Sequence, residues 1–339
     1  MDKQIVFVEK NKAELLEVES VALKPNQVRV KTVVSTISNG TEKANITGKP
    51  GVSIESKADS PVVFPRFSGY SASGVVVEKG IEVKKLEIGD RVAMYWSKHI
   101  SHNVINEKNA VKIESDAVSF EEAALAHIGT FPLAAIRKTR LEIGESAMVM
   151  GLGTLGLLAV QFARVAGAVP VIAVDPVKER REKALKFGAD YVLDPFAEDF
   201  VQRVKELTSG GVNVAIEVTG NGAGLNEVLD CMARFGRVAL LGCTRESDFT
   251  VDYYRKVHGP GITLIGAHTM ARPENDSHPG CFTTADDIKA ILKLCEAGRI
   301  NLKGMIDESH SPCECTEIYN RLVNDRNFPT VVQFEWARL

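Results

Sequence analysis

Short apolar runs alternate with longer amphipathic stretches through the middle of the chain. Apolar runs bounded by glycine, proline or charged residues predict strands, and apolar residues spaced three or four apart predict helices. The predicted strands lie at 146–150, 171–174, 191–193, 212–217, 237–241 and 262–265. The predicted helices lie near 155–167, 178–187, 198–208 and 224–234. This alternation predicts an α/β fold with a doubly wound parallel sheet.

The preceding part of the chain has a different pattern, in which short strands follow one another without intervening helices. Predicted strands at 4–8, 27–34, 74–80 and 90–94 are separated by proline and glycine turns, as is typical of a small β-barrel. The sequence pattern changes from strand-like to helix-like at Ser119, which is followed three residues later by Glu122. This capping pattern predicts the start of an alanine-rich helix that leads to His127.

The chain has 339 residues, and this length favours two domains over a single core. We expect a β-rich domain over 1–126 and a nucleotide-binding domain over 127–268. Residues 269–339 are expected to return to the first domain, with a polar loop over 269–283, helices over 286–296 and 317–323, and a strand over 330–334.

A glycine-rich turn after the strand 146–150 is the strongest functional signal in the sequence. Gly151, Gly153 and Gly156 have the G-x-G-x-x-G spacing that allows a tight turn, close approach to a pyrophosphate and close packing of helix on strand. The positive end of the following helix favours phosphate. The residues expected to hold the pyrophosphate are Gly151, Leu152, Gly153, Thr154, Leu155 and Gly156.

An acidic residue ends the next predicted strand. Asp175 lies 19 positions after Gly156 (175 − 156), close to the interval at which a carboxylate accepts hydrogen bonds from the adenosine ribose. A carboxylate repels a 2′-phosphate, so NAD is expected in preference to NADP. Lys178, Arg180 and Arg181 follow closely and are the residues able to meet that phosphate, although they also fit solvated positions on the next helix.

Ligands of open α/β sheets bind at the carboxyl ends of the strands. In this sequence the residues that follow the later strands are Thr219, Gly220, Gly242, Cys243, Ala267 and His268. We therefore expect them to surround the cofactor.

Composition narrows the set of partners. The net charge of −3, with 25% charged residues, gives no polycationic surface for nucleic acid, so a small-molecule substrate is expected. No apolar run reaches 18 residues, and the first residues lead directly into a strand, so we expect a soluble cytoplasmic protein that does not bind membranes. Six cysteines include no C-x-x-C pair, and Cys313 and Cys315 are interpreted as ordinary thiols.

These motifs together resemble the medium-chain dehydrogenase/reductase superfamily, which includes zinc alcohol and polyol dehydrogenases and zinc-free quinone reductases. The resemblance covers essentially the whole chain. The segments that carry it are 37–42, 67–74, 89–92, 151–156 and 217–220. It implies a GroES-like catalytic domain built from both ends of the chain around a central Rossmann domain, with hydride transfer in the cleft between them.

The sequence departs from the zinc enzymes of this superfamily at the metal ligands. The matching positions are Asn39, Tyr70 and His127, of which only His127 is a zinc ligand by chemistry. A catalytic zinc needs three protein ligands, so no zinc is expected. The alternative is a rearranged site that recruits Glu42, His99 or His102. No cysteine precedes Cys231, so the family's cysteine-rich lobe is also missing.

Without a metal, the chemistry must depend on a proton-transferring side chain and the nicotinamide. The resemblance brings Tyr70 and His127 to the catalytic cleft, where a phenol or an imidazole exchanges a proton with a substrate hydroxyl. Asn39, Thr41 and Glu42 are polar candidates for holding substrate. The polar loop 269–280 suits a polyhydroxylated substrate.

Three functions remain open at this stage. The first is an NAD-dependent alcohol dehydrogenase without zinc, acting on a sugar, polyol or glycoside. The second is a zinc-free quinone or enone reductase, and the third is a dinucleotide-binding protein without catalysis. A homodimer or homotetramer is expected, because the strand 262–265 would leave an apolar edge unpaired in a monomer.

Overall fold

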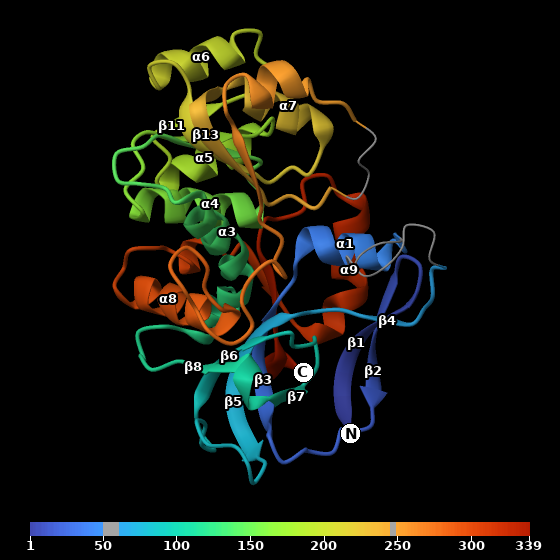
Figure 1. Ribbon diagram of the computed structural model, residues 1–339. Coiled ribbons are helices and arrows are strands. Elements are labelled where there is room, and N and C mark those ends of the chain that lie inside the picture. Colours follow the sequence, from blue (N-terminus) through green and yellow to red (C-terminus); the bar gives the residue numbers. More distant parts are fainter. Residues whose placement is uncertain (50–60, 245–248) are drawn as a thin grey trace. The chain divides into compact units, whose positions relative to one another are not determined.

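The computed structural model describes residues 1–49, 61–244 and 249–339, and the chain divides into two compact units (Figure 1). The first unit comprises residues 1–128, 288–298 and 302–339. The second unit comprises residues 129–287 and 299–301. Residues 269–287 thus group with the second unit, because Arg272 donates to the carbonyl of Thr130 and pairs with the buried Asp287.

The second unit contains the predicted parallel sheet. Within the described residues its strands have the order β11-β10-β9-β12-β13-β14, and every pair is parallel. The strands are β9 (Ala147–Met150), β10 (Val171–Val174), β11 (Tyr191–Leu193), β12 (Val212–Glu217), β13 (Met232–Leu240) and β14 (Thr263–Gly266). The helices between them are α4 (Thr154–Val165), α5 (Lys178–Lys186), α6 (Phe200–Leu207) and α7 (Gly222–Asp230). This is the doubly wound α/β fold that the sequence predicts.

The register of the sheet brings the functional turns to one edge. Met150 is level with Val174 on one side and with Glu217 on the other, and Glu217 is level with Leu240. Strand order reverses at β9, since the chain continues from β9 to β10 on one side and later returns to β12 on the other. The turns after β9, β10, β12 and β13 therefore begin at the same level.

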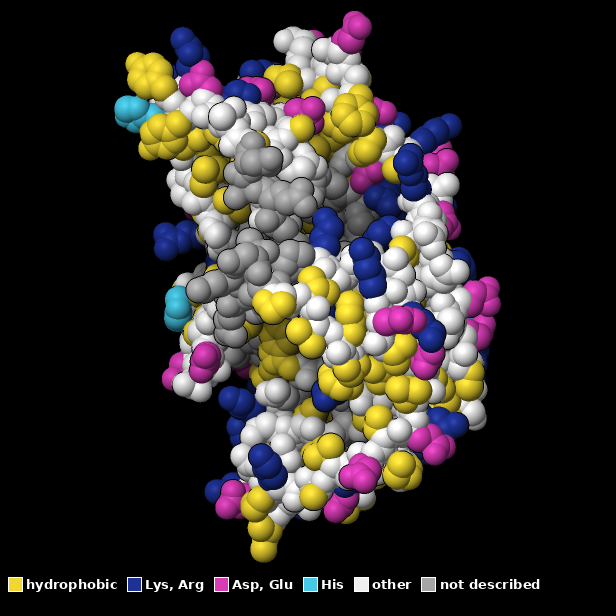
Figure 2. Space-filling view, turned by 90° about the vertical axis from the view of Figure 1, so that its right-hand side faces the viewer, with side chains coloured by type: hydrophobic (Ala, Val, Ile, Leu, Met, Phe, Trp, Pro, Cys, Tyr) yellow, Lys and Arg dark blue, Asp and Glu magenta, His cyan; other side chains and the backbone are white. Residues whose placement is uncertain are grey.

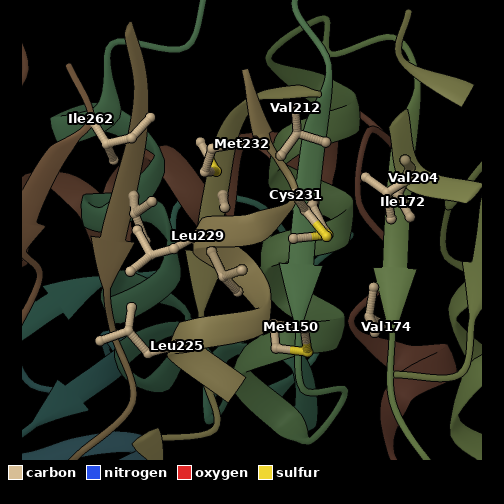
Figure 3. Close-up of a cluster of buried hydrophobic side chains, with 14 of the residues drawn as sticks. Met150, Ile172, Val174, Val204, Val212, Leu225, Leu229, Cys231, Met232 and Ile262 are labelled. Atoms are coloured by element: carbon tan, nitrogen blue, oxygen red, sulfur yellow. The ribbon is translucent and has the colours of Figure 1, made fainter. Parts of the chain in front are cut away.

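A buried apolar cluster joins this sheet to the helix α7 (Figure 3). Leu225 and Leu229 are one helical turn apart and so share a face of α7. They gather with Met150, Ile172 and Val212 of the central strands. Packing of this kind fixes the turns at the carboxyl edge of the sheet.

The first unit is built mainly from antiparallel strands contributed by both ends of the chain. One sheet has the order β15-β16-β3-β5-β6-β8, with β7 also paired to β3, and another has the order β2-β1-β4. Gln333 of β16 pairs with Thr36 of β3, which joins the carboxyl-terminal end to the amino-terminal part. The strands are β1 (Asp2–Glu9), β2 (Lys12–Val18), β3 (Gln27–Thr36), β4 (Arg66–Phe67), β5 (Ser71–Lys79), β6 (Arg91–Tyr95), β7 (His102–Asn106), β8 (Ala110–Lys112), β15 (Glu308–His310) and β16 (Val332–Glu335).

The remaining helices complete the two units. The α-helices among them are α1 (Asn39–Ile46), α2 (Phe120–Ala123), α3 (Ala126–Thr139), α8 (Thr284–Glu296) and α9 (Cys315–Asn324). Short 3-10 helices lie at Glu107–Asn109, Lys303–Met305, Pro312–Glu314 and Trp336–Arg338, and a π-helix lies at Tyr254–His258. Ser119 and Glu122 form the predicted capping box at the start of α2. The helix does not run unbroken to His127, because α2 ends at Ala123 and α3 begins at Ala126.

One further local prediction is wrong. Residues 231–234 are not helical: α7 ends at Asp230, and Met232 pairs with Val212 in the sheet. Pairing with a neighbouring strand here outweighs the helix propensity of the local sequence. Residues 39–46, which include part of the 37–42 segment, form the helix α1, for which the sequence analysis made no prediction.

Candidate active site

The glycine-rich turn after β9 has the geometry that phosphate binding requires. Gly151 has φ +98°, a conformation that side chains with a Cβ rarely adopt. A Cβ on Gly156 would lie 1.8 Å from the carbonyl oxygen of Gly151, so glycine is needed there for close packing. A Cβ on Gly153, the N-cap of α4, would meet no described atom within 4 Å. The helix therefore begins beside open space, and a pyrophosphate fits at this terminus.

Asp175 connects this turn to the turn after β10. Its Oδ2 accepts a hydrogen bond from the backbone N–H of Leu152, and its Oδ1 accepts one from Val177, both at 2.8 Å. The side chain is buried, and Arg180 lies 3.7 Å from Oδ2. A carboxylate has about four acceptor positions, so two backbone donors leave capacity for a ribose hydroxyl.

The other two cations near Asp175 are engaged elsewhere. Arg181 donates to the carbonyl oxygens of Asp175 and Pro176 and pairs with Asp194 at 3.0 Å. Lys178 pairs with Glu182 on the exposed side of α5. Arg180 is therefore the cation that lies against the Asp175 carboxylate.

The turn after β12 is held by a buried carboxylate. Glu217 accepts hydrogen bonds from the backbone N–H of Thr219 at 2.7 Å and of Gly220 at 3.1 Å, and from the Thr219 hydroxyl. Burial raises the pKa of Glu217 above its ordinary value. A Cβ on Gly151 would lie 3.2 Å from Cγ2 of Thr219, so Thr219 lies against the glycine-rich turn.

Gly242, after β13, packs against the turn that follows β12. A Cβ there would lie 2.3 Å from the backbone nitrogen of Gly220, and the Gly242 N–H donates to the carbonyl of Glu217 at 2.8 Å. The turn after β12 thus contacts both the turn after β9 and the turn after β13. This arrangement brings together Gly151, Thr219 and Gly242, which the sequence places far apart.

Ala267 and His268 follow the edge strand β14. Ala267 is buried and donates from its backbone to the carbonyl of Leu240. Burial, and then the positive charge of Lys138, lower the pKa of His268. Nδ1 of His268 accepts a hydrogen bond from the backbone N–H of Met270, so the neutral ring presents Nε2–H as a donor.

The first unit brings Tyr70 and His127 together. Their ring centroids are 5.5 Å apart with an interplanar angle of 84°. His127 is also 4.9 Å from the ring of Trp96 and 5.6 Å from that of Tyr95. We refer to Tyr70, Tyr95, Trp96 and His127 as the aromatic cluster. The Tyr70 hydroxyl donates to the hydroxyl of Ser38, so the phenol has a direct hydrogen-bonded neighbour.

Asn39, at the start of α1, is fixed by the chain near its carboxyl-terminal end. Its side-chain amide donates to the carbonyl oxygens of Pro329 at 2.8 Å and Thr330 at 3.1 Å. Thr41 is half-buried in the same helix. The amide of Asn39 therefore acts as a clamp between α1 and the segment before β16.

Glu42 lies in the interior of the first unit, where it is 1% exposed. It accepts from the backbone N–H of Ser38 at 2.8 Å and from the Tyr319 hydroxyl, and its Oε2 lies 3.2 Å from Nε2 of His99. Burial, and then the charge of Glu42, raise the pKa of Tyr319 well above its ordinary value. Glu42 thus holds the backbone of Ser38, the residue whose hydroxyl receives the Tyr70 hydrogen bond.

The rearranged metal site is only partly assembled. Glu42 and His99 are adjacent, but His102 pairs with Asp2 at 2.7 Å. Over residues 1–49, 61–244 and 249–339, no group of three or more His, Cys, Asp and Glu side chains is arranged to hold a metal ion. Asn39, Tyr70 and His127 also do not supply the donors of a catalytic zinc.

The sequence analysis did not identify Tyr95 and Trp96 as members of the aromatic cluster. They are adjacent aromatic residues three and four positions after Val92, and this pairing was the available signal. It also missed Tyr319, whose contact with Glu42 joins residues 277 positions apart.

In the part of the chain that is described, no helix is both long and apolar enough to cross a membrane.

Comparison with known proteins gives a consistent family assignment. The zinc-binding dehydrogenase family model matches residues 154–278. L-threonine 3-dehydrogenase of Pyrococcus horikoshii is 30% identical over 298 residues, which covers 78% of this chain and 83% of the relative. D-guloside 3-dehydrogenase of Escherichia coli K12 is 26% identical over 339 residues, which covers 95% and 96%.

A solved structure shows the same fold over nearly the whole chain. A protein described as a short chain alcohol dehydrogenase, from E. coli CFT073 and complexed with cofactor NADH, superposes with a TM-score of 0.83 at 18% identity, and the match covers 99% of both chains. Both units of this protein thus have counterparts in solved dehydrogenases. The chain belongs to the medium-chain dehydrogenase/reductase superfamily of NAD(P)-dependent oxidoreductases.

Proposed function

We propose that this protein is an NAD-dependent dehydrogenase that oxidises a hydroxyl of a sugar, polyol or glycoside, or reduces the corresponding carbonyl, without a catalytic zinc. The observation that carries the proposal is the contact between Tyr70 and His127. By the family resemblance, both residues occupy positions where zinc enzymes of the superfamily have metal ligands. Tyr70 carries a phenol, which is not a usual ligand of a catalytic zinc. A proton-transferring pair in place of a metal is the chemistry that such residues support.

The cofactor proposal depends on the second unit. NAD, when bound, takes up or releases the hydride of the reaction. The open N-terminus of α4 suits the pyrophosphate, and Asp175 suits the ribose hydroxyls. NAD is preferred because the buried Asp175 carboxylate would repel a 2′-phosphate. A neighbour with the same fold is bound to NADP, so the preference needs a direct measurement.

Residues of the first unit are proposed to accept the proton that the substrate hydroxyl releases. When a hydroxyl carbon loses its hydride, the hydroxyl must release a proton to a base. The Tyr70 oxygen and the His127 imidazole are the proposed acceptors, and the Ser38 hydroxyl is the next group in the hydrogen-bonded chain. Asn39 and Thr41 are proposed to shape this surface from the first turn of α1, and Glu42 is proposed to hold Ser38 in position.

The substrate class rests on the relatives. The guloside dehydrogenase acts on a glycoside by its name, and it matches 95% of this chain. The relatives also include a sorbitol dehydrogenase and a butanediol dehydrogenase of Bacillus subtilis. These names favour a hydroxyl substrate over the alternative of a quinone or enone reductase. They also favour catalysis over a role in dinucleotide binding alone.

We also propose a homodimer or homotetramer in the cytoplasm. The edge strand β14 ends the sheet of the second unit, and Leu264 on it is 40% exposed. Unpaired edges invite pairing with a second copy. The six cysteines are free thiols, as is usual for proteins of reducing compartments.

A substrate panel tests the proposal. Sugars, methyl glycosides, polyols, quinones and enones would each be combined with NAD(H) and NADP(H), and the nicotinamide absorbance would be followed. We expect turnover with polyhydroxylated substrates and NAD(H). Faster turnover of quinones or enones would favour the reductase alternative, and binding of NAD without any turnover would favour the non-catalytic one.

A further inference from the structure

Trp96 has a backbone conformation that a large side chain rarely adopts. Its φ is +55°, in the left-handed region where the Cβ of an L-residue is crowded. It follows the last residue of β6 directly. Strained residues of this kind persist where the surrounding structure fixes them, and they concentrate at functional sites.

The turn that presents Trp96 is fixed from inside the first unit. Asn103, which is buried, accepts from the backbone N–H of Lys98 at 2.8 Å and donates to the carbonyl of Lys98 at 3.1 Å. The backbone N–H of Ser97 donates to the carbonyl of Tyr70. These bonds hold the turn in place, so Trp96 cannot relax to an ordinary conformation without breaking them.

The indole of Trp96 is only partly used in packing. Its ring centroid lies 4.9 Å from that of His127, with an interplanar angle of 74°, and 6.0 Å from that of Tyr70, with an angle of 53°. It nevertheless remains 43% exposed. The other tryptophan, Trp336, is 5% exposed and donates from Nε1 to Ser35. An exposed indole next to the proposed proton acceptors is thus available to a ligand.

The face of an indole carries negative potential, which attracts the slightly positive C–H groups of a saturated ring. The closed ring of a sugar presents several C–H groups on one flat face and hydroxyls around its rim. An open-chain polyol must freeze several bonds to present a comparable face, and that ordering costs conformational entropy. An exposed indole therefore discriminates between these two substrate classes.

We propose that Trp96 is a stacking platform that selects the closed ring of a glycoside over open-chain polyols. The inference rests on the proposed function, since it takes Tyr70 and His127 as the groups that receive the substrate hydroxyl. The ring lies on the indole, and its rim hydroxyls face the Tyr70 side of the aromatic cluster. Trp96 determines specificity, and it takes no part in proton transfer.

Calorimetric titration of the full chain with NAD present tests the inference. Methyl hexopyranosides of several configurations would be compared with sorbitol and galactitol. We expect the best pyranoside to bind at least about tenfold more tightly than either polyol, and Trp96→Ala to weaken its binding by about tenfold. Trp96→Phe, which keeps an aromatic face, should lose less. Binding of the polyols should change little in either variant.

Phe235 provides a matched control. It also has a left-handed backbone, with φ +62°, and it is 72% exposed, but it belongs to the second unit and lies outside the aromatic cluster. Phe235→Ala should leave pyranoside binding unchanged. Thermal unfolding of each variant shows whether it is folded. In the wild type, pyranosides should also change tryptophan emission, and Trp96→Phe, which retains only the buried Trp336, should show no such change.

The outcomes separate this inference from the proposed function. If pyranosides bind in a Trp96-dependent way but the nicotinamide absorbance never changes, the proposed reaction fails and the platform stands. The platform is overturned if no pyranoside binds, if polyols bind as tightly, or if the folded Trp96→Ala protein keeps wild-type affinity. Turnover of a polyol under those conditions would leave the proposed reaction intact.

Discussion

The guanidinium of Arg180 lies 3.7 Å from the carboxylate of Asp175, the residue that also holds the glycine-rich turn through Leu152. We propose that this carboxylate has two tasks, since it orders the glycine-rich turn and would repel a 2′-phosphate. The neighbouring cation opposes the second task. On this proposal, the balance of these two charges determines the choice between NAD and NADP.

We predict that NAD(H) binds at least tenfold more tightly than NADP(H), because an uncompensated like-charge contact with Asp175 costs more than ~1.4 kcal/mol. Asp175→Ser should reduce this preference, since Arg180 is then free to meet the added phosphate. Adding Arg180→Met to that variant should remove the gain in NADP(H) affinity. Calorimetric titration of the four cofactor forms measures each step, and equal affinities in the wild type would contradict the prediction.

Glu217 gives a prediction about pH and stability. Burial raises its pKa above the ordinary value of 4.5, so its ionisation is less favourable in the folded state than in the unfolded state. The protonated Glu217 carboxyl therefore contributes fully to the free energy of unfolding below about pH 4.5, and this contribution is lost as pH rises through the pKa of the folded state. Glu217→Gln keeps an acceptor for Thr219 and Gly220 and cannot ionise. Its stability relative to the wild type should thus increase as pH rises over this window.

Urea unfolding at a series of pH values measures that difference. Glu217→Ala is the contrasting variant, because it removes the acceptor and should destabilise the turn by about 1–3 kcal/mol at every pH. A wild type that gains stability over Glu217→Gln as pH rises would show that the folded carboxyl has a lowered pKa instead.

The proton-transfer assignment is tested by Tyr70→Phe and His127→Ala. Loss of a general acid–base group lowers the rate by about 10²–10⁴, whereas loss of a packing contact mainly lowers stability. Tyr95→Phe is the matched control, because Tyr95 also contacts His127 but its hydroxyl donates to the carbonyl of Lys108. We expect it to keep turnover. If both test variants turn over a confirmed substrate at full rate, the shuttle lies elsewhere, and Glu42 and His268 are tested next.

Metal independence is a separate prediction. Asn39, Tyr70 and His127 lack the donor set of a catalytic zinc, so the purified protein should contain far less than one zinc per chain. Elemental analysis measures the metal content, and dialysis against a chelator should leave turnover unchanged. The proposal is falsified if zinc is found in stoichiometric amount and its removal abolishes turnover.

The edge strand β14 predicts the assembly state. An exposed edge with Leu264 in its middle favours pairing with a second copy. Light scattering at micromolar concentration should give at least twice the mass of one chain. Leu264→Lys places a charge on this edge and should shift the equilibrium toward monomer. A monomeric wild type would contradict the prediction.

The sequence was sufficient for much of the second unit. The strands β10, β11 and β12 begin and end at the predicted residues, because each is an apolar run bounded by turn residues. The strands β2 and β7 were missed, since β2 is rich in the helix formers Lys, Ala, Glu and Leu, and β7 is short and half polar. The helix α1 was missed because its glycine, threonine and asparagine residues are weak helix formers.

The candidate site was less predictable, because its contacts join distant parts of the chain. Motif spacing identified Asp175, since the strand, turn and helix between it and Gly151 form one local unit. No local pattern indicates that Glu42 contacts Tyr319 or that Trp96 packs on His127. These contacts depend on how α1, α3, β6 and α9 come together, which is a property of the tertiary structure.

The clamp formed by Asn39 makes this site resistant to redesign as a metal centre. Asn39→Cys would supply a thiolate, but the carbonyls of Pro329 and Thr330 would both lose the amide donor that now joins them to α1. Each lost bond to a partly buried group costs about 1–3 kcal/mol. An engineer who wished to install zinc would therefore have to rebuild the 329–330 segment together with the ligands, because a single exchange would weaken the scaffold before any metal was gained.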